Sequence, residues 1–206
     1  MPKRVNHECR RRQIADAVCE LIGRAGIEAA TLRQVAEEAS VSMGAVQRCF
    51  STRQQMLIFA QDHVNSRVTE RAQKLIAAAA EPESVTTMLE QTLQAMLLVD
   101  DPELVEARVW IAFSAQAAVD PVVAAAQREQ QRGLTELLEL LMRVGQESGG
   151  VHPGVIPAHV AEELIALTDG LTLQVLIGRQ SSDTARAVMR RVATGLRTNP
   201  STNYSA

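Results

Sequence analysis

The chain has 206 residues, of which 46% are hydrophobic and only 2% aromatic, and its net charge is −3. This composition supports a sizeable core, and its many Ala and Leu residues favour helices over a sheet built from β-branched and aromatic residues. Its three widely spaced cysteines form neither a disulfide framework nor a zinc signature, and no 18-residue apolar run or signal-peptide core is present. We therefore expect a reduced, soluble, cytoplasmic protein that does not enter a membrane.

Charge is unevenly distributed along the chain. Residues 1–60 carry nine Lys or Arg and six Asp or Glu, and the remaining 146 residues carry twelve and eighteen. A net charge of +3 is thus followed by one of −6, which favours a protein that docks a polyanion by one end. Taken alone this indication is weak, since a three-charge excess is common on protein surfaces.

The N-terminal segment predicts an arm followed by a helix. Residues 1–9 are expected to be a disordered, slightly basic arm. Four apolar residues then lie on one helical face, namely Ile14, Val18, Leu21 and Ile22. Gly23 and Gly26 are expected to end this first helix.

Three further helices are expected before residue 76. Two pairs have capping-box spacing, Thr31 with Gln34 and Ser51 with Gln54. Ser42 is the expected cap of a short helix over residues 43–50, and the helix that Ser51 opens reaches about residue 75. The tight turn between the second and third helices fits a helix-turn-helix.

The remainder predicts a linker and five more helices. Residues 77–83 form the linker, and the expected start signals are Ser84, Asp101-Pro102, Asp120-Pro121, Pro157 and Ser182. Residues 199–206 are polar and expected to be disordered. The sequence thus predicts an all-α fold of about nine helices.

A family resemblance rests on these N-terminal residues. The motif residues are Arg11-Arg12-Gln13-Ile14, Leu21-Ile22, Gly26, the run from Thr31 to Ala36, the run from Val41 to Val46, Phe50 and Arg53. Over residues 10–60 they resemble the helix-turn-helix domain of TetR-family regulators in type and spacing. Asp120-Pro121, Gly145-Gln146 and residues 166–174 look like the ligand-binding domain of the betaine-responsive repressor (BetI) group. The resemblance implies a DNA-binding domain over residues 1–55 and a ligand-binding and dimerisation domain over residues 56–206.

The short helix over residues 43–50 is the predicted reader of DNA bases. Val46 and Phe50 are expected to face inward, and Arg48 can form bidentate hydrogen bonds to guanine and Gln47 to adenine. With the positions that the resemblance assigns to operator contact, the predicted DNA-binding residues are Thr31, Arg33, Ser42, Met43, Gly44, Ala45, Gln47, Arg48, Cys49 and Arg53. Thr31 and Arg53 resemble the phosphate contacts of the family, and Lys3, Arg4, Arg10 and Arg11 could follow the DNA backbone or enter the minor groove.

Each of these residues also has a simpler interpretation. Thr31 and Ser42 would serve as caps in any helical protein, and Arg48 taken alone is an ordinary solvated arginine. Two positions depart from the family: Ser40 replaces the usual glycine of the turn, and Cys49 replaces the usual tyrosine or histidine. In a left-handed conformation Ser40 costs roughly 1 kcal/mol more than glycine.

The C-terminal helices predict a two-fold dimer and a ligand site. The predicted dimer-interface residues are Gly170, Leu173, Ile177, Val188 and Val192, and the predicted ligand-binding residues are Trp110, Phe113, Gln116, Arg128, Thr168 and Asp169. A palindromic operator mirrors such a dimer. Trp110 and Phe113 could instead simply fill the core, and the scarcity of aromatic residues disfavours a cage for a quaternary ammonium ligand.

Other classes of function remain as alternatives. The four histidines pair with no carboxylate or cysteine at a catalytic spacing, and no nucleotide-binding, hydrolase or metalloprotease motif is present. We therefore expect no enzyme, metal or cofactor. The partners we expect are double-stranded operator DNA, a small-molecule effector and a second copy of the chain. A DNA-binding dimer without an effector, or a helical scaffold that binds only proteins, are the competing hypotheses.

Overall fold

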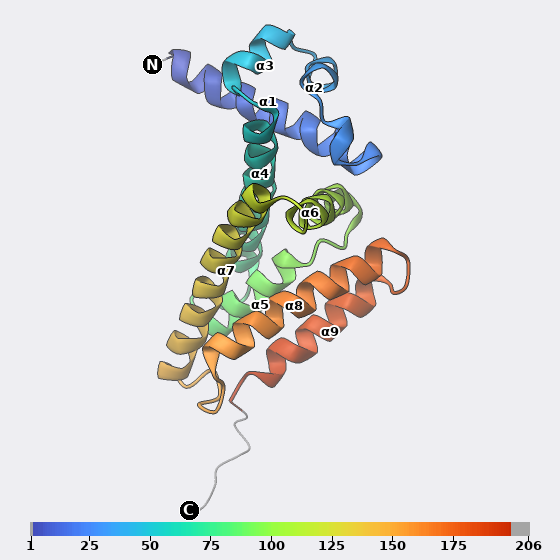
Figure 1. Cartoon of the computed structure of the whole chain (residues 1–206). Coiled ribbons are helices and arrows are strands. Elements are labelled where there is room, and N and C mark those ends of the chain that lie inside the picture. Colours follow the sequence, from blue (N-terminus) through green and yellow to red (C-terminus); the bar gives the residue numbers. More distant parts are fainter. Residues whose placement is uncertain (1, 199–206) are drawn as a thin grey trace, which may run out of the picture. The chain divides into compact units, whose positions relative to one another are not determined.

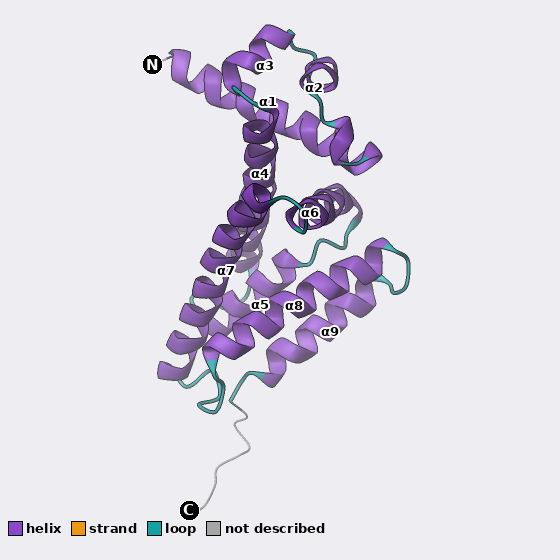
Figure 2. Ribbon diagram, in the orientation of Figure 1, coloured by secondary structure: helices purple, strands orange, loops and turns teal. Residues whose placement is uncertain are grey.

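The computed structural model describes residues 2–198, except for the side chains of residues 2–6 and Pro102. This part consists of helices joined by short loops, with no strand and one isolated bridge between Val151 and Arg197 (Figure 1, Figure 2). Its nine α-helices are α1 (Pro2–Ala25), α2 (Leu32–Glu38), α3 (Met43–Cys49), α4 (Arg53–Ala78), α5 (Val85–Met96), α6 (Leu104–Ala117), α7 (Pro121–Glu147), α8 (Pro157–Leu176) and α9 (Ser182–Gly195). Two 3-10 helices, η1 (Ile27–Ala29) and η2 (Asp101–Glu103), precede α2 and α6. The predicted all-α fold is confirmed.

The chain divides into two compact units. The first contains residues 1–67 and 100–128, and the second contains residues 68–99 and 129–206. The long helices α4 and α7 therefore each contribute to both units. Because α6 packs against α1, it belongs to the first unit together with α2 and α3. The functional division into residues 1–55 and 56–206 stays a prediction.

The core of the first unit joins α1 to the short helices and to α6. Ile14 and Val18 of α1 are fully buried in one cluster with Val46 of α3 and Phe113 of α6. A Cβ atom at Gly23 would lie only 3.1 Å from Val105 Cγ1 of α6, so glycine at this position permits the close approach of the two helices.

Gly23 therefore lies inside α1 and does not end it, contrary to the prediction. The helix continues to Ala25, and Gly26 follows with a positive φ of 82°. This left-handed conformation suits glycine and stops the helix. The prediction for Gly26 is confirmed.

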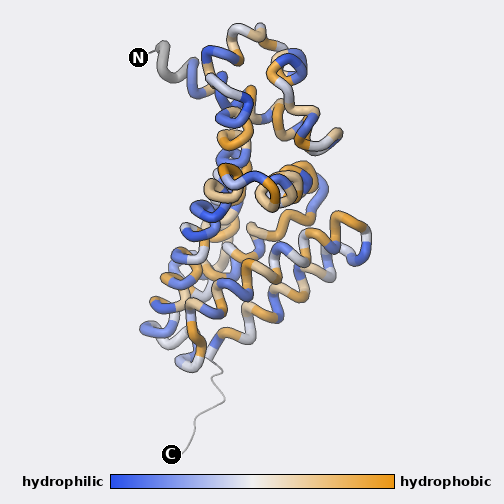
Figure 3. The backbone as a smooth tube through the Cα atoms, in the orientation of Figure 1, coloured by the Kyte–Doolittle hydropathy of each residue, from blue (hydrophilic) through white to orange (hydrophobic). Residues whose placement is uncertain are grey.

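The second unit is a bundle of α5, α8 and α9 with the later turns of α7. Its fully buried large side chains are Leu93, Leu97, Leu138, Met142, Leu164 and Met189. Polar and apolar residues alternate along α7 and α9 at helical spacing (Figure 3), so each of these helices buries one face. The loop before α8 is fixed by Gln146, whose Nε2 donates to the carbonyl oxygens of His152 (3.1 Å) and Val155 (2.8 Å).

The N-terminal residues differ from the prediction. Residues 2–9 belong to α1 instead of forming a disordered arm. Pro2 is compatible with a first helical turn, where its missing N–H has no acceptor. Once the apolar face from Ile14 onward has nucleated the helix, each added residue gains one hydrogen bond at little cost, so no apolar period is needed to extend it.

Three helix starts lie one residue away from their predicted caps. At the start of α4 the capping hydroxyl is that of Thr52 instead of Ser51, since Thr52 Oγ1 accepts from Gln55 N at 3.1 Å, while the backbone N–H of Ser51 donates to Gln55 Oε1 at 3.1 Å. The remaining caps are Asp100 instead of Asp101 at η2, Ser181 instead of Ser182 at α9, and Asp120 at α7 as predicted. Competing Ser, Thr and Asp neighbours offer equivalent oxygens, so spacing alone does not choose between them. The prediction for residues 199–206 lies outside the described residues.

Candidate nucleic-acid interface

The turn between α2 and α3 is closed by backbone hydrogen bonds. The N–H of Val41 donates to Ala36 O at 2.9 Å and that of Ser40 donates to Glu37 O at 3.1 Å, the pattern of a Schellman motif. Ser40 has a φ of 52°. The left-handed conformation expected of a family glycine is thus adopted here by serine. On the α1 side, Gln13 Nε2 donates to Ala39 O at 2.8 Å and holds the turn.

Both short helices have the predicted N-caps. Thr31 Oγ1 accepts from Gln34 N at 3.2 Å, and Ser42 Oγ accepts from Ala45 N at 3.2 Å. Thr31 Oγ1 also donates to Gln34 Oε1 at 2.8 Å, so the glutamine side chain meets the hydroxyl and not the backbone N–H of a full capping box. Local side-chain chemistry therefore fixes where α2 and α3 begin.

One face of α3 is buried and the opposite face is open. Val46 and Phe50 are buried, as predicted, whereas Met43 is 47% exposed and Gln47 and Arg48 are exposed. A Cβ atom at Gly44 would meet Arg48 Nη1 at 3.6 Å. The Arg48 side chain thus extends back along α3 toward its N-terminus, over the glycine.

Ala45 and Cys49, two of the predicted DNA-binding residues, are less exposed than Gln47 and Arg48. Both are half-buried, and Cys49 packs against the core of the first unit. At 100° per residue, position 49 lies beside Val46 on the helix circumference and therefore flanks the inner face. Their predicted roles in DNA contact stay predictions.

Arg53 is engaged within the protein. Its Nε donates to Ala30 O at 2.9 Å, and its Nη2 donates to Ile27 O. The first turn of α4 is thereby connected to the segment between η1 and α2. Arg33 lies on the surface in an ion pair with Glu37 at 3.1 Å. Neither contact was predicted from the sequence. The hydrogen bonds of Arg53 join residues more than twenty positions apart in the chain.

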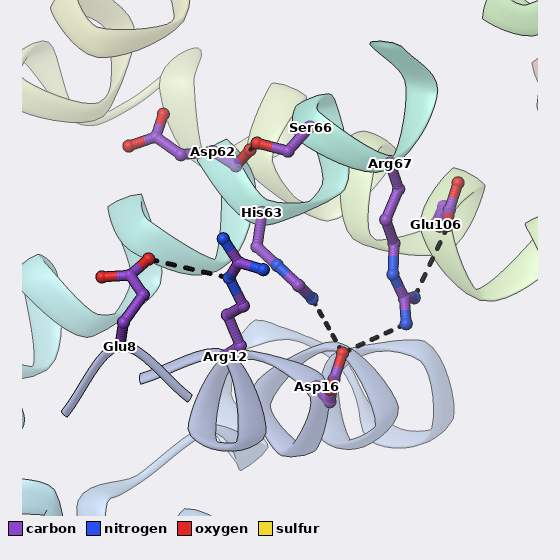
Figure 4. A network of polar contacts seen from close by, with 8 residues as sticks. All are labelled: Glu8, Arg12, Asp16, Asp62, His63, Ser66, Arg67 and Glu106. Atoms are coloured by element: carbon purple, nitrogen blue, oxygen red, sulfur yellow. Dashed lines mark hydrogen bonds and ion pairs between the residues drawn. The ribbon is translucent and has the colours of Figure 1, made fainter. Parts of the chain in front are cut away.

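A polar network links α1, α4 and α6 within the first unit (Figure 4). Asp16 Oδ1 lies 2.8 Å from His63 Nε2 and 3.1 Å from Arg67 Nη2. Arg67 Nη1 in turn lies 3.5 Å from Glu106 Oε1, and that glutamate side chain is only 6% exposed. Sequence analysis did not single out these four residues, because their spacing along the chain carries no motif.

The predicted ligand-binding residues are distributed over both units. Trp110, Phe113, Gln116 and Arg128 belong to the first unit, and Thr168 and Asp169 to the second. Phe113 is fully buried in the first core, which matches its simpler interpretation as a core residue. Thr168 donates to Leu164 O at 2.8 Å within α8, and burial raises the pKa of Asp169 to about 6.

The predicted dimer residues lie on α8, at its C-cap and on α9, where Val188 and Val192 pack partly against the core of the second unit. Gly170 is exposed, with no atom within 4 Å of a Cβ built on it, and Ile177 is 62% exposed. Leu173, Val188 and Val192 are half-buried. Within one chain, α8 is therefore left open at Gly170 and at its C-cap residue Ile177.

An open groove at one end of the second unit was not predicted. It has a volume of about 440 Å³ and is lined by His152, Ile156, His159 and Glu163 among others. The described residues contain no cluster of three or more His, Cys, Asp or Glu side chains arranged to hold a metal ion. Among the described helices, none combines the length and apolar character needed to cross a bilayer.

Two family models match the chain. Residues 14–58 match the model of bacterial regulatory proteins of the tetR family, and residues 85–197 match that of the BetI-type transcriptional repressor C-terminal domain. The HTH-type transcriptional regulator PksA of Bacillus subtilis is 32% identical over 177 residues, 86% of this chain and 83% of its own length. The HTH-type transcriptional regulator BetI of Escherichia coli K12 is 28% identical over 195 residues, 91% of this chain and 92% of its own.

Solved structures share the fold. A TetR-family transcriptional regulator from Cytophaga hutchinsonii superposes with a TM-score of 0.78 at 16% identity, covering 94% of this chain and 98% of that one. A protein from Saccharomonospora viridis, crystallised in complex with choline, superposes with a TM-score of 0.77 at 20% identity and covers 92% and 98%. Similarity at these identities establishes the architecture alone.

Proposed function

The chain belongs to the TetR family of DNA-binding transcription regulators, and from that premise we propose that it is a repressor that binds a palindromic operator as a homodimer and is released by a small molecule. The observation that carries the proposal is the open face of α3. Gln47 and Arg48 are exposed there, on a seven-residue helix that follows a closed turn. Such a helix fits the major groove, and these two side chain types discriminate base edges.

The proposed contacts fall into two classes. Met43, Gly44, Gln47 and Arg48 read bases, while Thr31, Arg33, Ser42 and Arg53 contact phosphates and fix the register. Ala45 and Cys49 lie at the margin of the reading face. Because Arg53 already donates two hydrogen bonds to backbone carbonyls, its proposed phosphate contact uses the rest of its guanidinium.

The proposed homodimer uses α8 and α9. Gly170 and Ile177 are exposed there, Leu173, Val188 and Val192 are half-buried beside them, and an exposed glycine allows close approach of a second helix. Two copies related by a two-fold axis would match two operator half-sites about 34 Å apart.

The effector is proposed to act through α4, which contributes to both units. A shift of α4 on effector binding would change the distance between the α3 helices of the two copies. Support for an effector comes from the match to the BetI-type C-terminal domain and from choline bound to one structural relative. Choline is not proposed as the effector of this chain, since an aromatic content of 2% disfavours an aromatic cage for its quaternary ammonium group. The alternative is a DNA-binding dimer without an effector.

Selection from a random DNA library tests the proposal. The purified chain is mixed with random duplexes at two salt concentrations, and bound duplexes are sequenced. We expect an inverted repeat whose enrichment weakens as salt rises. Arg48→Ala should blur one base position in each half-site, whereas Arg132→Ala, an exposed arginine of α7 paired with Glu129, should leave the motif intact. Absence of any motif at both salts would refute the proposal.

The effector is tested on the selected duplex. Choline and a panel of lipophilic compounds are screened for a rise in melting temperature, and each hit is then added to the protein–DNA complex. We expect a hit that stabilises the protein and weakens DNA binding, because the coupling of two ligands is reciprocal. Compounds that bind tightly yet leave DNA affinity unchanged would exclude release as the mechanism. No hit at all would favour the alternative.

A further inference from the structure

Arg11 of α1 lies against two aromatic rings. Its guanidinium carbon is 4.1 Å from the ring centre of Phe59 and 5.0 Å from that of Phe50. The two rings contact each other, with centres 5.3 Å apart and planes tilted by 51°. A guanidinium at these distances is attracted by the negative faces of the rings.

The three residues come from three different helices. Arg11 belongs to α1, Phe50 is the C-cap residue of α3, and Phe59 belongs to α4. The backbone N–H of Phe50 donates to Val46 O at 2.9 Å, and its side chain is only 2% exposed. The buried Phe50 ring and the last turn of α3 are therefore held in a fixed relation to each other.

The neighbouring arginine has a different environment. Arg12 is exposed and lies 3.6 Å from Glu8 in an ordinary surface ion pair. In contrast, the Nε of Arg11 is buried and finds no hydrogen-bond partner among the described residues. A polar group buried in this way costs free energy, so the contact of the guanidinium with the rings must compensate for it.

We propose that Arg11 is a positioning residue for operator recognition, which acts through Phe50 and Phe59 to set the orientation of α3 and does not itself contact DNA. This inference rests on the proposed binding of DNA by α3. The side chains of Gln47 and Arg48 project from the helix that Phe50 ends, so a small rotation of α3 displaces them from the base edges. Hydrogen bonds to bases tolerate displacements of only about half an ångström.

The test uses the duplex most enriched by the wild-type chain in the selection described above. Its affinity is measured by fluorescence anisotropy over a series of salt concentrations for the wild type, Arg11→Met and Arg12→Met. Both substitutions remove one positive charge from α1. We expect Arg11→Met to raise the Kd about tenfold at every salt concentration, with the slope of log Kd against log salt unchanged. Arg12→Met should change the Kd less than about twofold.

Phe59→Leu provides an independent variant, since it removes one ring and leaves Arg11 in place. If Arg11 acts through the rings, the effects of Arg11→Met and Phe59→Leu on the Kd will be less than additive in the double variant. Arg11→Lys keeps the charge but loses the planar group, and it should not restore wild-type affinity. Melting curves of each variant give the folded fraction used to correct the Kd.

Four outcomes would overturn the inference. A salt slope reduced by about one, with affinity restored by lysine, would make Arg11 a phosphate contact. Additive effects of the two substitutions would separate Arg11 from the rings. Equal effects of Arg11→Met and Arg12→Met, or a change explained entirely by the folded fraction, would leave no positioning role. If the wild type selects no duplex, it is the proposed function that fails.

Discussion

Arg67 of α4 and Glu106 of α6 form an ion pair, with 3.5 Å between Nη1 and Oε1, in which the arginine side chain is 43% exposed and the glutamate side chain only 6%. The same guanidinium contacts Asp16 of α1 at 3.1 Å. Arg67 of α4 thus contacts side chains of both α1 and α6. The unequal exposure makes the glutamate the sensitive partner, because a buried carboxylate without its cation loses far more than an exposed arginine does.

We expect Arg67→Met to lower the free energy of unfolding by about 1–3 kcal/mol, since it leaves Glu106 buried without this arginine. Urea unfolding monitored by circular dichroism measures the change. Arg132→Met, which disrupts an exposed i,i+3 pair with Glu129, is the matched control and should cost less than about 0.5 kcal/mol. The double variant Arg67→Met, Glu106→Gln should recover part of the loss. Equal costs for the two arginine variants would contradict this account.

Ser40→Gly should stabilise the protein. Ser40 has a φ of 52° in the turn before α3, where a side chain costs roughly 1–2 kcal/mol relative to glycine, while the greater flexibility of unfolded glycine offsets about 0.5–1 kcal/mol. We therefore expect a net gain of several tenths of a kcal/mol up to about 1 kcal/mol in urea unfolding. Ser40→Val should be destabilising, because a β-branched residue fits this conformation poorly. A loss of stability in the glycine variant would show that Ser40 makes a compensating interaction.

Stability should depend on pH through Asp169. Burial raises the pKa of this carboxyl from 3.8 to about 6, so between these values the folded protein keeps a proton that the unfolded chain has released. The contribution of Asp169 to stability therefore falls as pH rises through this window and reaches its lowest level above about pH 6. Asp169→Asn should flatten this part of the pH profile and raise stability at pH 7.

The matched control for Asp169 is Glu163→Gln, which removes an exposed carboxylate from the same helix. Chemical unfolding at a series of pH values from 4 to 7.5 gives the profile of each variant. Glu163→Gln should preserve the wild-type slope. If Asp169→Asn keeps the same slope as the wild type, the decline has another origin.

Cys9 and Cys19 should differ sharply in reactivity. Cys19 is 1% exposed, and burial raises its pKa to about 12, whereas Cys9 is exposed on α1. Because the thiolate is the reacting species, Cys19 should react with a disulfide reagent only after unfolding. Cys9→Ala should remove the fastest phase in the native protein. Labelling of Cys19 as fast as Cys9 would show that the first core opens readily.

The sequence by itself determined those features that depend on neighbours within one or two helical turns. Thr31 and Ser42 cap α2 and α3 because each hydroxyl meets an N–H three residues ahead, and Val46 and Phe50 face inward because four residues nearly complete one turn. Ser40 takes the left-handed conformation because the helix-turn-helix requires it there. The prediction of a disordered arm is wrong for residues 2–9, because a helix needs no apolar pattern to extend once it is nucleated.

Only the tertiary structure decided the roles of residues whose partners lie far along the chain. Arg53 and Arg11 both have the charge of a phosphate contact, yet one donates to Ala30 and Ile27 and the other stacks on Phe50 and Phe59. Phe113, a predicted ligand contact, fills the core beneath α1. A sequence pattern lists which groups a side chain offers, but the packing of helices determines which partner is near enough to be met, since hydrogen bonds and ring contacts act over only a few ångströms.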